Sequence, residues 1–317
     1  MTTITTGSKF YDNTKLSSYK TCPRSFQLRH ILNITPDRAA VPLVFGSSWH
    51  AAMDIVWQHA KEFNQADLRK YAALKFIETW EEGGMPADMS LEDIERFSPR
   101  TPSVAEEMLL HYIDQRWHIL QNCEIIACEQ PFAVPLPACP DVWYVGRLDK
   151  VISHDGQILV IEHKTTSEYK IDGGFRQTYI EGWDMDSQVK GYEYGAALFF
   201  GAEQVWVDAA LVHKKVHDKF RFIPVSHQRG MLDEWIESTV EWVVRVGVDV
   251  DNGYFPKNEN SCVGKYGPCQ FTDICRSCSK PSELTETPFG YRVEPWTPFE
   301  VLGLESLIKQ GEQDAQR

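Results

Sequence analysis

The sequence predicts an α/β fold in which a layer of helices precedes a sheet of several strands. Residues 143–162 carry the β-branched and aromatic residues of two strands, with Asp155-Gly156 as a tight turn between them. Before this hairpin, apolar residues within 51–122 recur at helical spacing, and after it helical and strand-like stretches alternate. We therefore expect a helical layer inserted ahead of the sheet, and further helices between the later strands.

The apolar spacing and the turn residues place each element along the chain. We expect helices at 15–31, 46–63, 66–82, 103–122, 184–200 and 227–250, and strands at 124–134, 143–152, 157–162, 204–213 and 219–225. A serine of Gly46-Ser47-Ser48 is the expected N-cap of the second helix. The stretches 34–43 and 83–102 are expected to be loops.

Composition is that of an ordinary globular protein, with 43% hydrophobic and 24% charged residues among 317. A formal net charge of -13 argues against indiscriminate binding to nucleic acid. This net charge does not exclude a local basic groove, because part of the acidic charge is concentrated in one segment: residues 78–95 alone carry seven carboxylates. Basic residues gather elsewhere, within 20–30 and 214–221.

Two features of the sequence bear on its compartment. Residues 1–11 are polar and lack the apolar core of a signal peptide, and no run approaches the ~18 apolar residues of a membrane span. Eight cysteines in such a chain indicate metal or redox roles rather than a disulfide framework. We expect a cytoplasmic protein with no membrane partner.

The hairpin carries a group of charged residues that could perform chemistry. Glu162 and Lys164 are two apart on a strand and so share a face, and the hairpin can bring Asp149 beside Glu162. Two carboxylates suit Mg²⁺ or Mn²⁺, and a lysine beside them can stabilise developing negative charge or orient a water molecule. The alternative is a surface salt-bridge cluster. The apolar run Ile158–Ile161 favours the first interpretation, because a carboxylate leaving a buried strand needs a partner or a metal.

This pattern resembles a known family. Asp149, followed after twelve residues by Glu162-His163-Lys164 and then Thr165-Thr166-Ser167, is similar to the PD-(D/E)xK nuclease superfamily in its RecB-like branch. Leu148 stands where the proline of the superfamily name would be. The resemblance implies a central mixed sheet with helices on both faces, a restriction-endonuclease-like core. It also implies metal-dependent cleavage of DNA, with Lys164 orienting or deprotonating the attacking water.

Two further segments match the same family in the expected order. Gln188 and Tyr192 share a helix face, and His50 follows Gly46 in Gly-x3-His spacing. Taken alone, Gln188 and Tyr192 are an ordinary solvated glutamine beside a half-buried tyrosine, and His50 is a structural histidine. The resemblance implies that Gln188 and Tyr192 hold the scissile strand or the active-site water. It implies that His50 joins Asp149 and Glu162 at the metal, where an imidazole suits Mn²⁺ better than Mg²⁺.

Cysteines near the end of the chain form a second candidate site. Cys262, Cys269, Cys275 and Cys278 fall within seventeen residues and could form a local zinc knuckle. The alternative recruits Cys22, which lies in a Cys-Pro-Arg context. Resemblance to the iron–sulfur subgroup of RecB-like nucleases implies a 4Fe–4S cluster held by Cys22, Cys262, Cys269 and Cys275.

The resemblance covers most of the chain and implies one nuclease domain at 1–280. It comprises a helical insertion at 51–122, a catalytic core at 123–225 and the cysteine segment 262–278, followed by a tail at 281–317. The expected activity is that of an exonuclease at single-stranded or duplex DNA ends, in recombination, repair or phage DNA processing. A helicase or a recombination protein is a candidate partner.

Two other interpretations remain beside the exonuclease. One is a nuclease of CRISPR spacer acquisition. The other is a non-catalytic module that retains the fold and binds DNA ends or protein. The complete set of His50, Asp149, Glu162 and Lys164 counts against the non-catalytic module, because a binding module has no need of all four.

Overall fold

The computed structural model describes residues 4, 8–169, 173–213, 219–264 and 267–304. The chain divides into two compact units. The sheet unit comprises residues 39–130 and 148–228, and the terminal unit comprises residues 1–38, 131–147 and 229–317. The strands β3 (Glu124–Pro135) and β4 (Val142–His154) each have residues in both units.

The sheet unit contains a mixed sheet, as the sequence predicts. The second half of β4 pairs antiparallel with β5 (Gln157–Thr166), which pairs parallel with β6 (Gln204–Leu211), and β6 pairs antiparallel with β7 (Phe220–Val225). Asp155 and Gly156 both have positive φ, 49° and 79°, and turn the chain between β4 and β5 so that His154 lies opposite Gln157. The parallel pair requires a crossover, which contains α8 (Ser187–Phe200).

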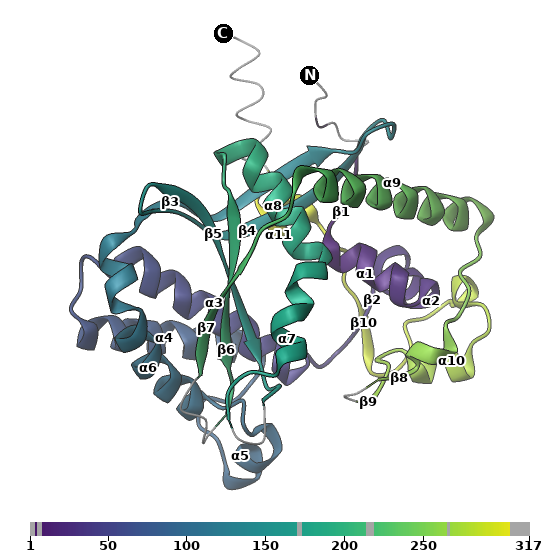
Figure 1. Cartoon of the computed structure of the whole chain (residues 1–317). Helices are drawn as coiled ribbons and strands as arrows, with labels where there is room; N and C mark the ends of the chain where they lie inside the picture. Colours follow the sequence, from purple (N-terminus) through teal and green to yellow (C-terminus); the bar gives the residue numbers. More distant parts are fainter. Residues whose placement is uncertain (1–3, 5–7, 170–172, 214–218, 265–266, 305–317) are drawn as a thin grey trace. The chain divides into compact units, whose positions relative to one another are not determined.

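The helices before the sheet form a layer that shares its core. They are α3 (Val41–His59), α4 (Gln65–Glu82), α5 (Leu91–Phe97) and α6 (Pro102–Asn122) (Figure 1). Most of the apolar side chains of the core come from α3, α4 and α6. The large buried residues of this core include Phe45, Trp49, Phe76, Trp80, Tyr112 and Phe220.

The sheet of this unit is covered on both faces. Leu159 and Ile161 of β5 point into the core made with the helical layer. Glu162, the next residue, bonds to Gln188 of α8. Since neighbouring residues of a strand point to opposite faces, α8 and the helical layer lie on opposite sides of the sheet. The predicted fold class, a mixed sheet flanked by helices, is confirmed.

Some predicted boundaries are wrong. The helix expected from Gly46 begins at Val41, because Pro42 fits its first turn, and Ser48 bonds back to the carbonyl of Val44 at 2.9 Å instead of capping the helix. The loop expected at 83–102 contains α5, which a capping box of Ser90 and Asp93 begins.

The predicted helix at 15–31 is interrupted. It is divided into α1 (Asn13–Thr21), α2 (Pro23–Phe26) and a π-helical turn, η1 (Gln27–Ile31). Cys22 between α1 and α2 is extended, because the residue before a proline is disfavoured in helical conformation.

The terminal unit is built from elements near both ends of the chain. Strand β1 (Lys9–Tyr11) runs parallel to the first half of β4, and β2 (Ile34–Pro36) pairs antiparallel with β10 (Tyr291–Val293). Its long helix is α9 (Arg229–Asn252), to which Tyr19 of α1 is tied by a 2.7 Å hydrogen bond to Asp249. The cysteine segment contains β8 (Val263–Gly264), β9 (Gly267–Pro268) and α10 (Thr272–Ser277), and the last described helix is α11 (Pro298–Leu302).

Short helical elements complete the description. These are α7 (Gln177–Gly182), η2 (Trp183–Met185), η3 (Glu259–Ser261) and η4 (Pro281–Glu283). In the described part of the chain no helix combines the length and apolar character needed to cross a bilayer.

Packing in the helical layer should dominate the stability of the sheet unit. Replacing the fully buried Phe76 of α4 with alanine is expected to lower the free energy of unfolding by about 3–5 kcal/mol, since it removes contacts and leaves a cavity. The control Leu74→Ala removes a side chain from the same helix that is 54% exposed, and should cost less than about 0.5 kcal/mol. Urea unfolding followed by tryptophan fluorescence measures both, and equal losses would contradict this packing.

Candidate active site

Two buried carboxylates lie side by side on the β4–β5 hairpin. Lys150 of β4 pairs with Ile161 of the antiparallel β5, so Asp149, which precedes Lys150, lies across from Glu162, which follows Ile161. Asp149 is 6% exposed and Glu162 is 1% exposed. The register set by the Asp155-Gly156 turn therefore brings together the two acids that the sequence selects.

Each carboxylate has cationic or N–H partners. Lys164 donates a hydrogen bond to Glu162 Oε1, and Gln188 Nε2 lies 3.4 Å from the same oxygen. His50 Nδ1 of α3 lies 3.2 Å from Asp149 Oδ2, which also accepts the backbone N–H of His163 at 2.8 Å. Both acids are thus held in fixed orientations.

The Gln188–Tyr192 pair lies on the first turns of α8. Asp186 caps this helix by accepting from the backbone N–H groups of Gln188 and Val189 at 2.8 and 3.0 Å. Gln188 also donates from Nε2 to the hydroxyl of Tyr192 at 2.8 Å. The cap therefore fixes the start of the helix that carries Gln188 to Glu162.

The two carboxyl groups differ in acidity because their surroundings differ. Burial and the nearby Asp149 carboxylate raise the pKa of Glu162 to about 7, against the opposing effect of Lys164 and His50. Burial alone would raise the pKa of Asp149, but His50 and Lys150 hold it well below its ordinary value. The cationic neighbours thus keep Asp149 ionised, and the buried carboxylate of Asp149 in turn holds Glu162 near its titration point.

The neighbouring carboxylates raise the pKa values of the basic groups His50 and Lys164. Burial lowers the pKa of His50, but Asp149 more than offsets this, and the net pKa lies above the ordinary value. Burial likewise opposes the charged form of Lys164, and Glu162 and Asp149 raise its pKa above the ordinary range. The field in this region therefore favours positive charge.

The donor set fits a hard or borderline divalent cation. It consists of two carboxylates and an imidazole, and Glu162 Oε2 is buried without a hydrogen-bond partner. Among the described residues, however, no three His, Cys, Asp or Glu side chains are grouped closely enough to make a ready metal site. His50, Asp149 and Glu162 are the residues that could hold an ion, and here the two acids are paired with His50 and Lys164.

Sequence reasoning missed a second ion pair beside the site. Lys150 is fully buried, and its Nζ lies 2.8 Å from Oδ1 of Asp54. Asp54 lies one turn after His50, so α3 contacts β4 through both residues. The signal available in the sequence was the i, i+4 spacing of His50 and Asp54.

The cysteines of the candidate cluster lie in the terminal unit. Cys22 Sγ accepts the backbone N–H of Asn258 at 3.4 Å, and Cys262 Sγ lies 3.9 Å from the carbonyl oxygen of the same residue. Burial raises the pKa of Cys275, and the charges of Cys22 and Cys269 add to this effect. All eight cysteines lie within the described residues and each is a free thiol.

Arg24 fixes the cysteine segment from the other end of the chain. It is buried, and it donates to the carbonyl oxygens of Phe255 and Ser279, both at 3.1 Å. The Cys-Pro-Arg stretch and the late cysteines are therefore brought into one region.

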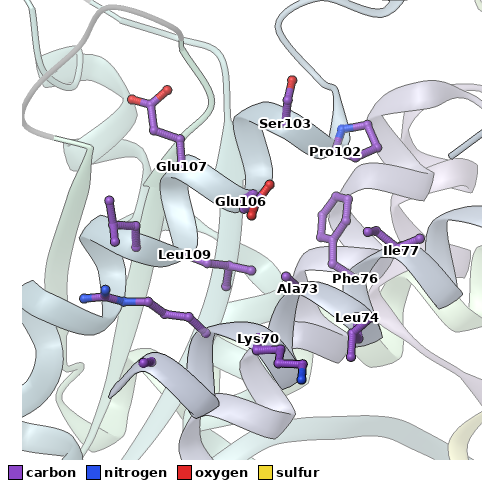
Figure 2. A pocket seen from close by; sticks show the side chains of 13 residues that line it. Lys70, Ala73, Leu74, Phe76, Ile77, Pro102, Ser103, Glu106, Glu107 and Leu109 are labelled. Atoms are coloured by element: carbon purple, nitrogen blue, oxygen red, sulfur yellow. The ribbon is translucent and has the colours of Figure 1, made fainter. Parts of the chain in front are cut away.

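Two other features of the surface do not coincide with the predicted site. A groove of about 790 Å³ lies between α4 and α6, and its apolar lining is joined by five polar or charged residues, namely Arg69, Lys70, Ser103, Glu106 and Glu107 (Figure 2). None of the predicted site residues line it. The basic turn expected at 214–218 lies outside the described residues, and the neighbouring Lys219 is buried against Glu107 at 2.7 Å.

Comparison with known proteins identifies the family. A sequence profile described as the PD-(D/E)XK nuclease superfamily matches residues 13–276, most of the chain. This chain belongs to the PD-(D/E)XK nuclease superfamily. Its membership identifies the chain as a nuclease, and the resemblance that the hairpin motif suggested is confirmed.

Solved structures give weaker likenesses. A protein from Eubacterium rectale provisionally assigned as an exonuclease is 12% identical, with a TM-score of 0.48 over 90% of this chain and 91% of that one. The alkaline exonuclease of Laribacter hongkongensis is 10% identical, with a TM-score of 0.29 over 66% and 94%. No curated protein sequence matches the chain.

The Lys150–Asp54 pair should make a measurable contribution to folding. Asp54→Ala leaves a buried ammonium without its partner and is expected to cost about 3 kcal/mol of unfolding free energy. The control Glu78→Ala breaks the exposed Lys75–Glu78 pair and should cost no more than about 1 kcal/mol. Urea unfolding measures both. If the two changes have the same small effect, Lys150 does not depend on Asp54.

Proposed function

We propose that this nuclease is a metal-dependent deoxyribonuclease, and specifically an exonuclease that acts on DNA ends. The observation that carries the proposal is the grouping of Asp149, Glu162, Lys164 and His50 at the end of the β4–β5 pairing. One buried oxygen of Glu162 faces no hydrogen-bond donor. Such an acid needs a proton or a cation.

His50, Asp149 and Glu162 are the proposed ligands of Mg²⁺ or Mn²⁺. A bound divalent ion would supply Lewis-acid stabilisation and lower the pKa of a water molecule. Asp149 is suited to this role because it stays ionised, held by His50 and the His163 N–H. Glu162 has the free oxygen.

Lys164 and Gln188 are proposed to act on the reacting groups. The Lys164 ammonium is directed at Glu162 Oε1 and would orient a water molecule at that edge or stabilise charge on the phosphate. Gln188, tied to Tyr192 at 2.8 Å, would hold the scissile strand or that water. In this proposal Lys164 of β5 acts on the water or the phosphate charge, and Gln188 of α8 orients the substrate strand or the water.

The DNA-end preference rests on the RecB-like motif set and not on a surface feature. The proposed substrates are single-stranded or duplex DNA ends. The proposed process is recombination, repair or phage DNA processing, with a helicase or a recombination protein as partner. We place the protein in the cytoplasm, which its eight free thiols support. We also retain a single nuclease domain at 1–280 as part of this proposal.

The rival is a non-catalytic module that binds DNA ends or protein. Digestion of end-labelled linear DNA with Mn²⁺ or Mg²⁺, beside circular DNA of the same sequence, separates the alternatives. An exonuclease shortens the linear molecule and leaves the closed circle intact. Lack of cleavage with either metal would favour the binding module.

Variants of the hairpin should separate metal binding from chemistry. Glu162→Gln is expected to abolish cleavage and weaken Mn²⁺ binding, because it removes the charge of a proposed ligand. Lys164→Met is expected to abolish cleavage while Mn²⁺ and DNA still bind, because the ammonium would act on water or phosphate. Calorimetric titration with Mn²⁺ and the digestion assay provide the two readouts.

The matched control for these variants is Glu78→Gln, an exposed acid of α4 in the same unit. It should retain wild-type cleavage and Mn²⁺ affinity. Wild-type cleavage by either hairpin variant would mean that the β4–β5 hairpin is not the catalytic centre.

A 4Fe–4S cluster held by Cys22, Cys262, Cys269 and Cys275 is the second part of the proposal. Support comes from the shared contacts of Cys22 and Cys262 with Asn258, and from the proximity of Cys22 and Cys269 to Cys275, whose pKa they help to raise. Backbone N–H donation to a cysteine sulfur, as at Cys22, is a contact that tunes iron–sulfur sites. When bound, the cluster would link segments 240 positions apart in the chain.

Iron and zinc contents of cysteine variants test this cluster. Anaerobically purified wild-type protein should contain about four irons per chain. Cys22→Ala should lose iron and stability together, since metal-binding energy is folding energy, whereas Cys278→Ala should retain iron. Protein with one zinc that is lost in Cys278→Ala and retained in Cys22→Ala would establish the zinc knuckle instead.

A further inference from the structure

We propose that Asp208, acting through His163, is a positioning residue for the metal-binding carboxylate Asp149. The inference deepens the proposed metal-dependent activity and rests on it. It assigns a role to a buried polar network on the face of the sheet opposite Glu162, which the hairpin motif does not include.

Asp208 is the centre of this network. It lies on β6 and is 1% exposed. Its carboxylate accepts the hydroxyl of Tyr112 and, at 2.9 Å, a guanidinium N–H of Arg116, both from α6. The hydroxyl of Tyr112 in turn accepts Trp57 Nε1–H of α3 at 2.8 Å. The orientation of the Asp208 carboxylate is therefore determined by two helices of the layer.

His163 connects this network to the site. It is the β5 residue paired with Asp208 in the parallel ladder, and its Nδ1 lies 3.2 Å from Asp208 Oδ2. Its backbone N–H donates to Asp149 Oδ2 at 2.8 Å. His163 thus faces the Asp208 carboxylate with its ring and bonds to Asp149 with its backbone N–H.

The position of His163 in the chain makes this coupling direct. It stands between Glu162 and Lys164, so a rotation of the strand at residue 163 would displace both neighbours and release Asp149. The ring is fully buried and its centroid lies 6.0 Å from those of both His50 and Trp57. Nδ1 lies within ion-pair distance of Asp208 Oδ2, although the two atoms are not aligned as a hydrogen bond, and this polar contact limits the rotation that would bring the backbone N–H out of line with Asp149.

Stability alone gives a poor account of this arrangement. An apolar residue at 163 would match the buried neighbours Ile161 and Leu159 and would require no carboxylate on β6. Burying Asp208, Arg116 and His163 together carries a desolvation cost that an apolar core of similar volume avoids. Directional contacts hold a side chain in a fixed orientation. Residues that contact a metal ligand commonly change the affinity for the metal by fixing the orientation of that ligand.

Mn²⁺ affinity of Asp208→Asn is the primary test, measured by the EPR signal of free Mn²⁺ in a titration of the full chain. The amide is close in size to the carboxylate but no longer provides a charged acceptor to His163, so Mn²⁺ should bind about 10–100-fold more weakly. Urea unfolding of the same variant measures its stability separately. Unchanged Mn²⁺ affinity in a folded Asp208→Asn protein would overturn the proposal.

The matched control is Glu107→Gln on the same helix, α6, which removes the negative charge that pairs with the buried Lys219 without touching the network. It should lower stability and leave Mn²⁺ affinity within a factor of about two of wild type, well inside the tenfold effect expected of a lost outer-shell partner. An equal loss of Mn²⁺ affinity in this control would reduce the effect of Asp208 to general destabilisation and overturn the proposal.

Variants at His163 keep the test decisive if Asp208→Asn does not fold. Asn can place a side-chain donor near the position of Nδ1, so His163→Asn should retain more Mn²⁺ affinity than His163→Leu at equal stability. Equal affinities in the two variants would contradict a role for the side chain. If the wild type itself binds no Mn²⁺, the proposed metal-dependent function fails, whereas a wild type that binds Mn²⁺ with unaffected variants fails only the positioning role.

Discussion

The register of β4 against β5 is the constraint on which the candidate site depends. Asp149 and Glu162 lie across from each other only because Asp155 and Gly156 close the turn with positive φ and His154 pairs with Gln157. A slip of one residue would turn every side chain of one strand to the opposite face. It would bury Lys164 among the apolar residues of the helical layer and remove Glu162 from Asp149.

Because this register places the carboxylates of Asp149 and Glu162 side by side in a buried region, their negative charges must be balanced by neighbouring groups. Two acids in close contact with little exposure cannot both be ionised without compensation, so the pKa of Glu162 rises to about 7 while Asp149 is held ionised by His50 and Lys150. Compensation comes from three elements: His50 of α3, Lys164 of β5 and Gln188 of α8. The arrangement is suited to phosphodiester chemistry, in which negative charge develops and must be met by preorganised cations and donors.

Local patterns were sufficient to predict the hairpin and the order of the elements. The Asp-Gly turn, the alternation around Glu162 and the apolar spacing of α4 and α6 are all short-range signals. Boundaries were predicted less well at α3, where Pro42 allows an earlier start than the Gly-Ser-Ser stretch suggests, and at Cys22, where Pro23 interrupts the helix. Both errors concern how a proline affects the residues around it.

The residues that sequence reasoning missed are tied to the site by distant contacts. Asp54 and Lys150 are 96 positions apart, as are Tyr112 and Asp208, and no periodicity links such pairs. His163 was visible in the sequence as the middle residue of Glu-His-Lys, but its partner on β6 could be found only from the parallel pairing of β5 and β6. The structure therefore adds the groups that hold the predicted residues in place.

The central claim is that the β4–β5 hairpin binds the metal used for cleavage. Anomalous diffraction from crystals of the wild-type protein grown with Mn²⁺ tests it most directly. The account predicts a manganese peak bounded by the carboxylates of Asp149 and Glu162 and the imidazole of His50. A peak at other residues, or none at a Mn²⁺ concentration that supports DNA cleavage, would contradict it.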